Sequence, residues 1–204
     1  MRTSKLMLLE RLGRTLGSDE DARRWVQRLR TGDSGDLYRL LLEFVRQGWL
    51  THEEFYWLVP PNDYGATYEV RDVLLAVMYE ALNCAERGKP FPALTGEESP
   101  PAPDETLQRL QALGQRLLEG LPNFSAWLGR LQTARSPREI RGAYLSAVQR
   151  GALSWPGFVF LAPLEDTQRT WLLRDYLLAF LFDRAREMLP EEVATSEPTT
   201  EEVG

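Results

Sequence analysis

Apolar residues recur with the helical period of three to four along most of the chain, and no segment shows the sustained alternation of a β-strand. Capping and stop residues divide this pattern into segments. A capping box from Thr51 to Glu54 and a glycine after a helix end at Gly48 mark two of the boundaries. In the first part of the chain the pattern predicts helices over about 4–16, 18–30, 36–48, 51–58 and 67–87. We therefore expect an all-α protein.

The same order of segments returns in the second part of the chain. Residues 25–34 align with 127–136, and after one extra residue 36–80 align with 139–183, giving 19 identities in 55 positions. We interpret this as a tandem duplication of a module of about five helices. The expected domains are copy 1 over 1–88, a proline-rich linker over 89–104, copy 2 over 105–188, and an acidic tail over 189–204 that its composition predicts to be disordered.

The helix predicted over 67–87 is apolar on two faces that lie about 140° apart. Leu74 and Val77 belong to one face, and Leu75 and Tyr79 belong to the other. The second copy repeats both faces over 165–187. Because a helix with two apolar faces needs two partners, we expect these two helices to be central. Each would pack against both copies in a pseudo-two-fold arrangement.

An Arg–Asp pair interrupts the apolar pattern of both helices, as Arg71-Asp72 and Arg174-Asp175. Successive side chains on a helix point about 100° apart. We therefore expect the members of each pair to bind separate partners rather than each other. The structural interpretation is a partly buried polar network that ties helices together. The alternative is a binding site for an anion or a phosphate group.

Few residues in the chain suit catalysis or metal binding. The single histidine, His52, lies beside two glutamates, and the single cysteine, Cys84, has no pattern of catalytic partners around it. One cysteine and one histidine exclude an internal disulfide and a Cys/His zinc site. The sequence also lacks a glycine-rich phosphate loop and a His-Glu-x-x-His motif. We therefore expect no catalytic residue, no metal and no cofactor.

The net charge of −6 is concentrated at the end of the chain. Residues 187–204 hold six acidic residues and no basic one, so the remainder has 24 of each sign. A neutral body indicates no general preference for polyanions. The chain has neither an apolar run of about 18 residues nor a signal-peptide pattern, which predicts a cytoplasmic protein without a membrane segment.

The duplication and the aromatic-rich helices favour a non-enzymatic interaction protein, an adaptor or accessory subunit of a larger complex, whose partner is another protein. The candidate contact surface lies where the two copies differ, because divergence leaves one surface free to specialise. It comprises Trp49 and His52 in the first copy and Trp155 in the second.

Two further hypotheses stay open. One is a nucleic-acid-associated subunit in which the arginines of the first two predicted helices neutralise phosphates. These residues are Arg11, Arg14, Arg23, Arg24, Arg28 and Arg30. The other is a small-ligand-binding protein or enzyme with a pocket between the modules, near Arg71, Arg174, Tyr79 and Phe182.

Overall fold

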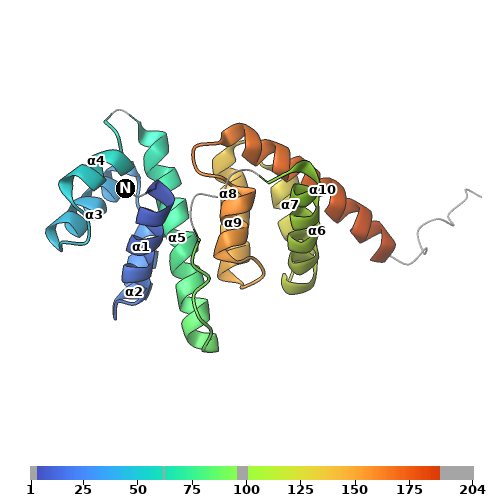
Figure 1. Cartoon of the computed structure of the whole chain (residues 1–204), viewed down its shortest axis with the longest axis horizontal. Coiled ribbons are helices and arrows are strands. Elements are labelled where there is room, and N and C mark those ends of the chain that lie inside the picture. Colours follow the sequence, from blue (N-terminus) through green and yellow to red (C-terminus); the bar gives the residue numbers. More distant parts are fainter. Residues whose placement is uncertain (1–3, 62, 96–100, 189–204) are drawn as a thin grey trace, which may run out of the picture.

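The computed structural model describes residues 4–61, 63–95 and 101–188, and within these residues the chain forms ten α-helices and no β-strand (Figure 1). The all-α prediction is confirmed. The first half comprises α1 (Lys5–Gly17), α2 (Ala22–Thr31), α3 (Ser34–Arg46), α4 (His52–Leu58) and α5 (Tyr64–Arg87). The second half comprises α6 (Pro103–Gly120), α7 (Phe124–Thr133), α8 (Pro137–Gln149), α9 (Trp155–Leu161) and α10 (Thr167–Met188). The tail over 189–204 lies outside the described residues.

Side-chain caps start several of these helices. The predicted box at α4 is present, because the Thr51 hydroxyl accepts from the Glu54 N–H (3.1 Å) and the Glu54 carboxylate accepts from the Thr51 N–H (2.9 Å). A second box, between Asp33 and Asp36, starts α3 two residues before the predicted position. Gly88 ends α5 in the left-handed region, with φ of 61°.

Helix α5 lies between the two halves, as Figure 1 shows. Helices α1, α2, α3 and α4 pack on one side of it, and α8 and α9 pack on the other. Residues from both predicted apolar faces are buried, including Leu74, Val77, Leu75 and Tyr79. The prediction that α5 has two partners is therefore confirmed.

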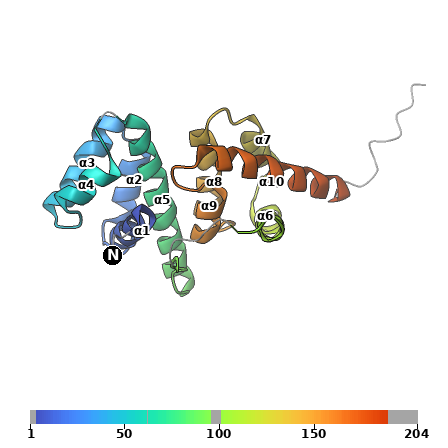
Figure 2. The ribbon, with the colours of Figure 1, turned by 45° about the horizontal axis from the view of Figure 1, so that its top comes forward.

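The prediction of a pseudo-two-fold arrangement around two central helices is wrong. Helix α10 packs on α6, α7, α8 and α9 and extends away from α5 (Figures 1 and 2). The loop before α10 does reach the first half, where Glu165 pairs with Lys5 and donates its backbone N–H to Glu69 (2.9 Å). Because α8 and α9 cover the second face of α5, α10 has no access to that face, and its own second face stays open.

Glycines allow the closest helix approaches in each half. A Cβ atom on Gly13 of α1 would lie 2.6 Å from the Val77 Cβ atom of α5. A Cβ atom on Gly114 of α6 would lie 2.5 Å from the Phe180 ring of α10. Both distances are far below van der Waals contact, so each long helix packs directly against a glycine backbone.

The segment after α5 returns along α1 rather than hanging free. The Arg14 guanidinium lies 4.7 Å from the centre of the Phe91 ring, and the Leu94 N–H donates to Glu10 (2.9 Å). Helix α6 then begins at Pro103, with Pro in the first helical position.

Candidate functional site

A buried cluster of charges joins the two halves at Asp72, whose side chain is 1% exposed. Its Oδ1 atom accepts from the Arg71 Nε and Nη2 atoms (3.0 and 2.8 Å), and its Oδ2 atom accepts from the Arg141 Nε atom of α8 (3.0 Å). The expectation that neighbours in sequence would not pair is wrong. Although the two Cα–Cβ bonds diverge, the arginine side chain is long enough to curve back to the adjacent carboxylate.

The ring of Tyr68 lies beside this cluster and attracts two cations. The Arg138 guanidinium lies 3.9 Å from the ring centre, and that of Arg71 lies 5.0 Å from it. Both are within the range of favourable cation–π attraction. Arginines from α5 and α8 therefore meet over one aromatic side chain of α5.

The matching pair on α10 has a different environment. Arg174 donates through Nε to Asp175 (2.8 Å) and through Nη1 to the carbonyls of Leu131 and Ala134 (3.2 and 3.4 Å), so it binds the end of α7. The side chain of Asp175, in contrast, is 64% exposed. The same Arg–Asp sequence thus joins the two halves on α5, whereas on α10 its arginine binds α7 and its aspartate faces solvent.

These contacts favour the structural interpretation of the Arg–Asp pairs over an anion site. The guanidinium groups of Arg71 and Arg141 already bind the buried Asp72 carboxylate, so an incoming anion would meet a negative charge that is already in place. Removing one member of a buried ion pair costs about 3–5 kcal/mol. The sequence does not single out Arg141, whose only signal is a charge on the otherwise apolar face of its helix.

A second polar contact between the halves involves Trp155, one of the residues of the candidate contact surface. Trp155 is fully buried, and its Nε1 atom donates to the Glu10 carboxylate (2.9 Å), which also accepts the Leu94 N–H. Trp155 was predicted as a surface residue, and that prediction is wrong because α9 packs on α5 and brings the indole to α1. The sequence does not single out Glu10 either.

The other two residues of that candidate surface lie in the first half. Trp49 is partly buried against the rings of Trp25 and Phe44, with ring centres 5.8 and 5.7 Å apart. His52 is exposed at the start of α4 and contacts the edge of Tyr56 (4.8 Å). The structure therefore does not bring Trp49, His52 and Trp155 together on one free surface.

Acidic residues accompany the arginines of the first two helices. Arg11 pairs with Glu54 (2.9 Å), Arg23 with Glu86 (3.3 Å) and Arg28 with Glu43 (3.0 Å). Burial acts to raise the pKa of Glu54, but the Thr51 N–H and Arg11 outweigh it and the pKa is lowered. Three of the six charges proposed for phosphate contacts are thus paired within the protein, whereas Arg24 and Arg30 are exposed.

The residues proposed for a pocket between the modules belong to two helices that do not run along each other. Tyr79 is buried on α5, whereas Phe182 is exposed on α10. An open polar depression lies elsewhere, between α6 and α10. In the described part of the chain no three His, Cys, Asp or Glu side chains gather as a metal site would require. None of its helices has the length and apolarity to cross a bilayer.

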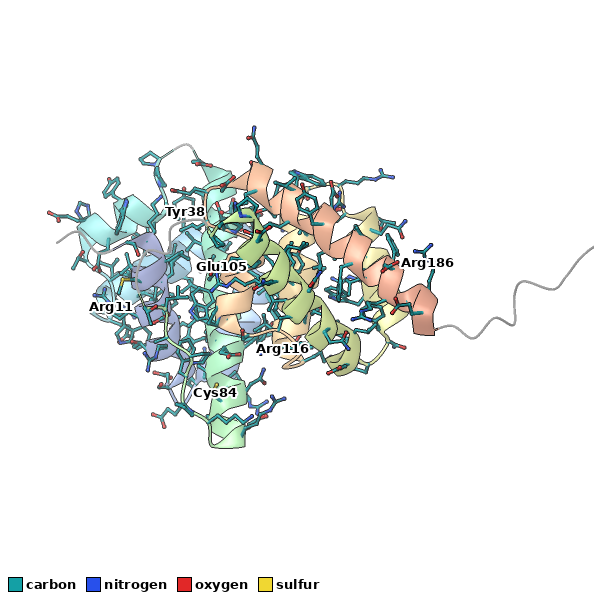
Figure 3. All side chains as sticks on the ribbon, turned by 45° about the vertical axis from the view of Figure 1, so that its right-hand side comes forward. Arg11, Tyr38, Cys84, Glu105, Arg116 and Arg186 are labelled. Atoms are coloured by element: carbon teal, nitrogen blue, oxygen red, sulfur yellow. The ribbon has the colours of Figure 1, made fainter. Side chains whose placement is uncertain are left out.

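Three of the exposed large apolar side chains, Leu172, Tyr176 and Phe182, follow one side of α10. We define the α10 outer face by six exposed residues at helical spacing: Leu172, Asp175, Tyr176, Ala179, Phe182 and Arg186. Tyr176, in the middle of this row, is 53% exposed. Figure 3 shows Arg186 near the far end of α10, and Tyr38 on the opposite side of the molecule. Contiguous exposed apolar residues of this kind mark interaction sites.

Comparison with known proteins gives no relative. The chain matches no protein-family model, no curated protein and no solved structure.

Proposed function

We propose that this chain is a non-enzymatic interaction protein, an adaptor or accessory subunit, which binds a protein partner through the α10 outer face. We further propose that it arose by duplication of a five-helix module. These two proposals support each other, because the duplication explains why α10 carries an apolar face that nothing in the described structure covers.

Helix lengths and contacts support the duplication. Helices α2 and α7 have 10 residues each, α3 and α8 have 13, and α4 and α9 have 7. Within each half the last helix packs on the four that precede it. In addition, Val77 packs against Gly13, and the residue aligned with it, Phe180, packs against Gly114.

The observation that carries the functional proposal is the contrast between α5 and α10. Asp72, Ala76 and Tyr79 lie on one side of α5 and are buried, and their aligned counterparts Asp175, Ala179 and Phe182 are exposed on α10. On α5 this side meets α8, through Asp72 and Arg141. A helix face that is built to be covered in one half and is open in the other is suited to binding a partner.

Affinity purification from the native host tests this proposal. Tyr176→Glu places a charge in the middle of the α10 outer face, and Met7→Glu places one at an exposed residue of α1. Since both side chains are exposed, neither change should unfold the protein. We expect the proteins that copurify with the wild type to be retained by Met7→Glu and lost by Tyr176→Glu. Equal recovery with both variants would refute the proposed role of α10.

A further inference from the structure

We infer that the partner of the α10 outer face is a second copy of this chain, which docks head-to-tail through its α3 and α4 helices. The contact would repeat the packing of α5 on α8 and α9 between two molecules. This inference rests on the proposed duplication and on the proposed role of the α10 outer face.

The internal contact between the halves is heterologous, because it uses two different surfaces. The last helix of the first half, α5, meets the third and fourth helices of the second half, α8 and α9. In a two-fold contact the same surface would serve both partners. By the proposed duplication, each half has a surface on its last helix and a surface on its third and fourth helices. The internal contact uses α5 together with α8 and α9, and it does not use the corresponding surfaces on α10 and on α3 and α4. Figures 1 and 2 show α3 and α4 at one end of the molecule and α10 extending toward the other end.

Two hydrogen-bonded contacts define how α5 binds α8. Asp72 binds Arg141, and about three turns further along α5 the Asn83 Nδ2 atom donates to the Val148 carbonyl (2.9 Å). The aligned residues on α10 are Asp175 and Arg186, and both are exposed. Both ends of the α5 contact row are thus open on α10 and carry hydrogen-bonding groups.

The receiving surface shows this contrast most clearly at one residue, Leu42. On α8 the residues that face α5 include Arg141, Leu145 and Val148, at the spacing of one helix face, and all are buried. The aligned residues on α3 are Tyr38, Leu42 and Val45, so the leucine and the valine are identical in both halves. Leu145 is 8% exposed and Leu42 is 53% exposed. We define the α3–α4 face by Leu42 and His52, which are exposed, and by Tyr38 and Val45, which are partly buried against the core.

The contact at the start of α4 differs from its internal counterpart. His52 aligns with Trp155, which enters the first half and binds Glu10. In addition, Tyr38 stands in place of Arg141, so the buried Asp–Arg pair would not be repeated between molecules. The receiving face therefore lacks the arginine of its internal counterpart, while Asp175 keeps Arg174 as its own partner.

Because the contact is heterologous, it generates a ring or an open chain of molecules rather than a closed pair. The two surfaces can therefore be blocked one at a time in purified full-length protein. Leu42→Glu blocks the α3–α4 face and leaves the α10 outer face intact, whereas Tyr176→Glu does the reverse. Each variant alone then lacks one of the two complementary surfaces, and an equimolar mixture restores exactly one contact.

Sedimentation velocity over about 1 to 100 µM, the range of moderate protein affinities, measures the outcome. We expect the wild type and the Met7→Glu control to grow beyond one chain with concentration. We expect each blocked variant to stay monomeric, with association weakened at least about tenfold, and their mixture to form a one-to-one dimer. Circular dichroism checks folding, and Leu42→Gln and Tyr176→Gln replace any glutamate variant that fails to fold.

Three results would overturn the inference. The first is a wild type that stays monomeric throughout, and the second is a mixture of blocked variants that stays monomeric. The third is association lost by Tyr176→Glu but kept by Leu42→Glu, which would mean that the α10 outer face pairs with itself. A monomeric wild type whose host partner is still lost by Tyr176→Glu would overturn self-assembly alone and leave the proposed interaction function standing.

Discussion

Replacing Asp72 by asparagine measures how much the buried ion pairs of this residue stabilise the protein, and the pair on α10 provides the comparison. The substitution keeps the size of the side chain and removes its charge. Arg71 and Arg141, whose side chains are 12% and 10% exposed, then lose their shared carboxylate partner. Asp175→Asn is a matched control, because this aspartate also follows an arginine to which it is bound but faces solvent.

The expected magnitudes differ clearly. Breaking a buried ion pair from one side costs about 3–5 kcal/mol, because a charge is left without compensation. An exposed pair contributes about 0.2–1 kcal/mol. The free energy of unfolding should therefore fall by at least about 2 kcal/mol more for Asp72→Asn than for Asp175→Asn, which is a factor of about 30 in the folding equilibrium constant.

Urea unfolding followed by circular dichroism measures this difference, provided that the variants share the wild-type dependence on urea concentration. Adding Arg141→Met to Asp72→Asn should recover part of the loss, since it removes a guanidinium left without its carboxylate. Equal losses for the two aspartates would show that the contact between the halves does not depend on the Asp72 cluster.

Three further predictions concern the interior. Tyr144→Phe should raise the free energy of unfolding by about 1 kcal/mol in urea titrations, because the Tyr144 hydroxyl is buried without a hydrogen-bond partner; a loss would contradict this. Gly13→Ala should lower the free energy of unfolding by about 1–3 kcal/mol, because the new methyl group would clash with Val77. Gly129 has no atom within 4 Å of an added Cβ, so Gly129→Ala should raise the free energy of unfolding by about 0.5–1 kcal/mol. Equal effects of the two substitutions would argue against close α1–α5 packing. Burial raises the pKa of Glu80 from its ordinary 4.5, so the folded state holds this proton to higher pH than the unfolded state. The contribution of Glu80 to stability should therefore fall as the pH rises from about 4.5 through the raised pKa of this residue. In thermal melts recorded across pH, Glu80→Gln should remove the part of the pH dependence that Glu80 causes.

Local signals in the sequence predict most helix boundaries, because caps and stops act within one turn. Thr51 and Glu54 form the predicted box, and Gly48 follows the end of α3 with a positive φ of 77°. The start of α2 differs, since the sequence predicts this helix from about residue 18, where Ser18 lies. Instead the Ser18 hydroxyl donates to the Arg14 carbonyl at the end of α1, and α2 begins at Ala22. A serine between two helices can serve either one, and local sequence does not decide between them.

Long-range placement could not be predicted, because identical local sequences meet different neighbours. Arg71-Asp72 and Arg174-Asp175 read alike, yet one aspartate is buried by α8 and the other faces solvent. Trp155 diverges from His52, and divergence suggested exposure. The indole is buried because Glu10, far away in the chain, accepts its N–H. Which surface stays free depends on how the halves pack, and this is visible only in the structure.

Hydroxyl-radical footprinting of the recovered complex tests the central claim most directly, because it reports the solvent exposure of individual side chains. The free protein exposes Tyr176 and Phe182 on α10 and Met7 on α1. We expect oxidation of Tyr176 and Phe182 to slow strongly in the complex, while oxidation of Met7 is unchanged. Unchanged oxidation of both aromatic residues, with protection confined to α1 and α2, would contradict the account and favour the arginine-rich helices as the binding surface.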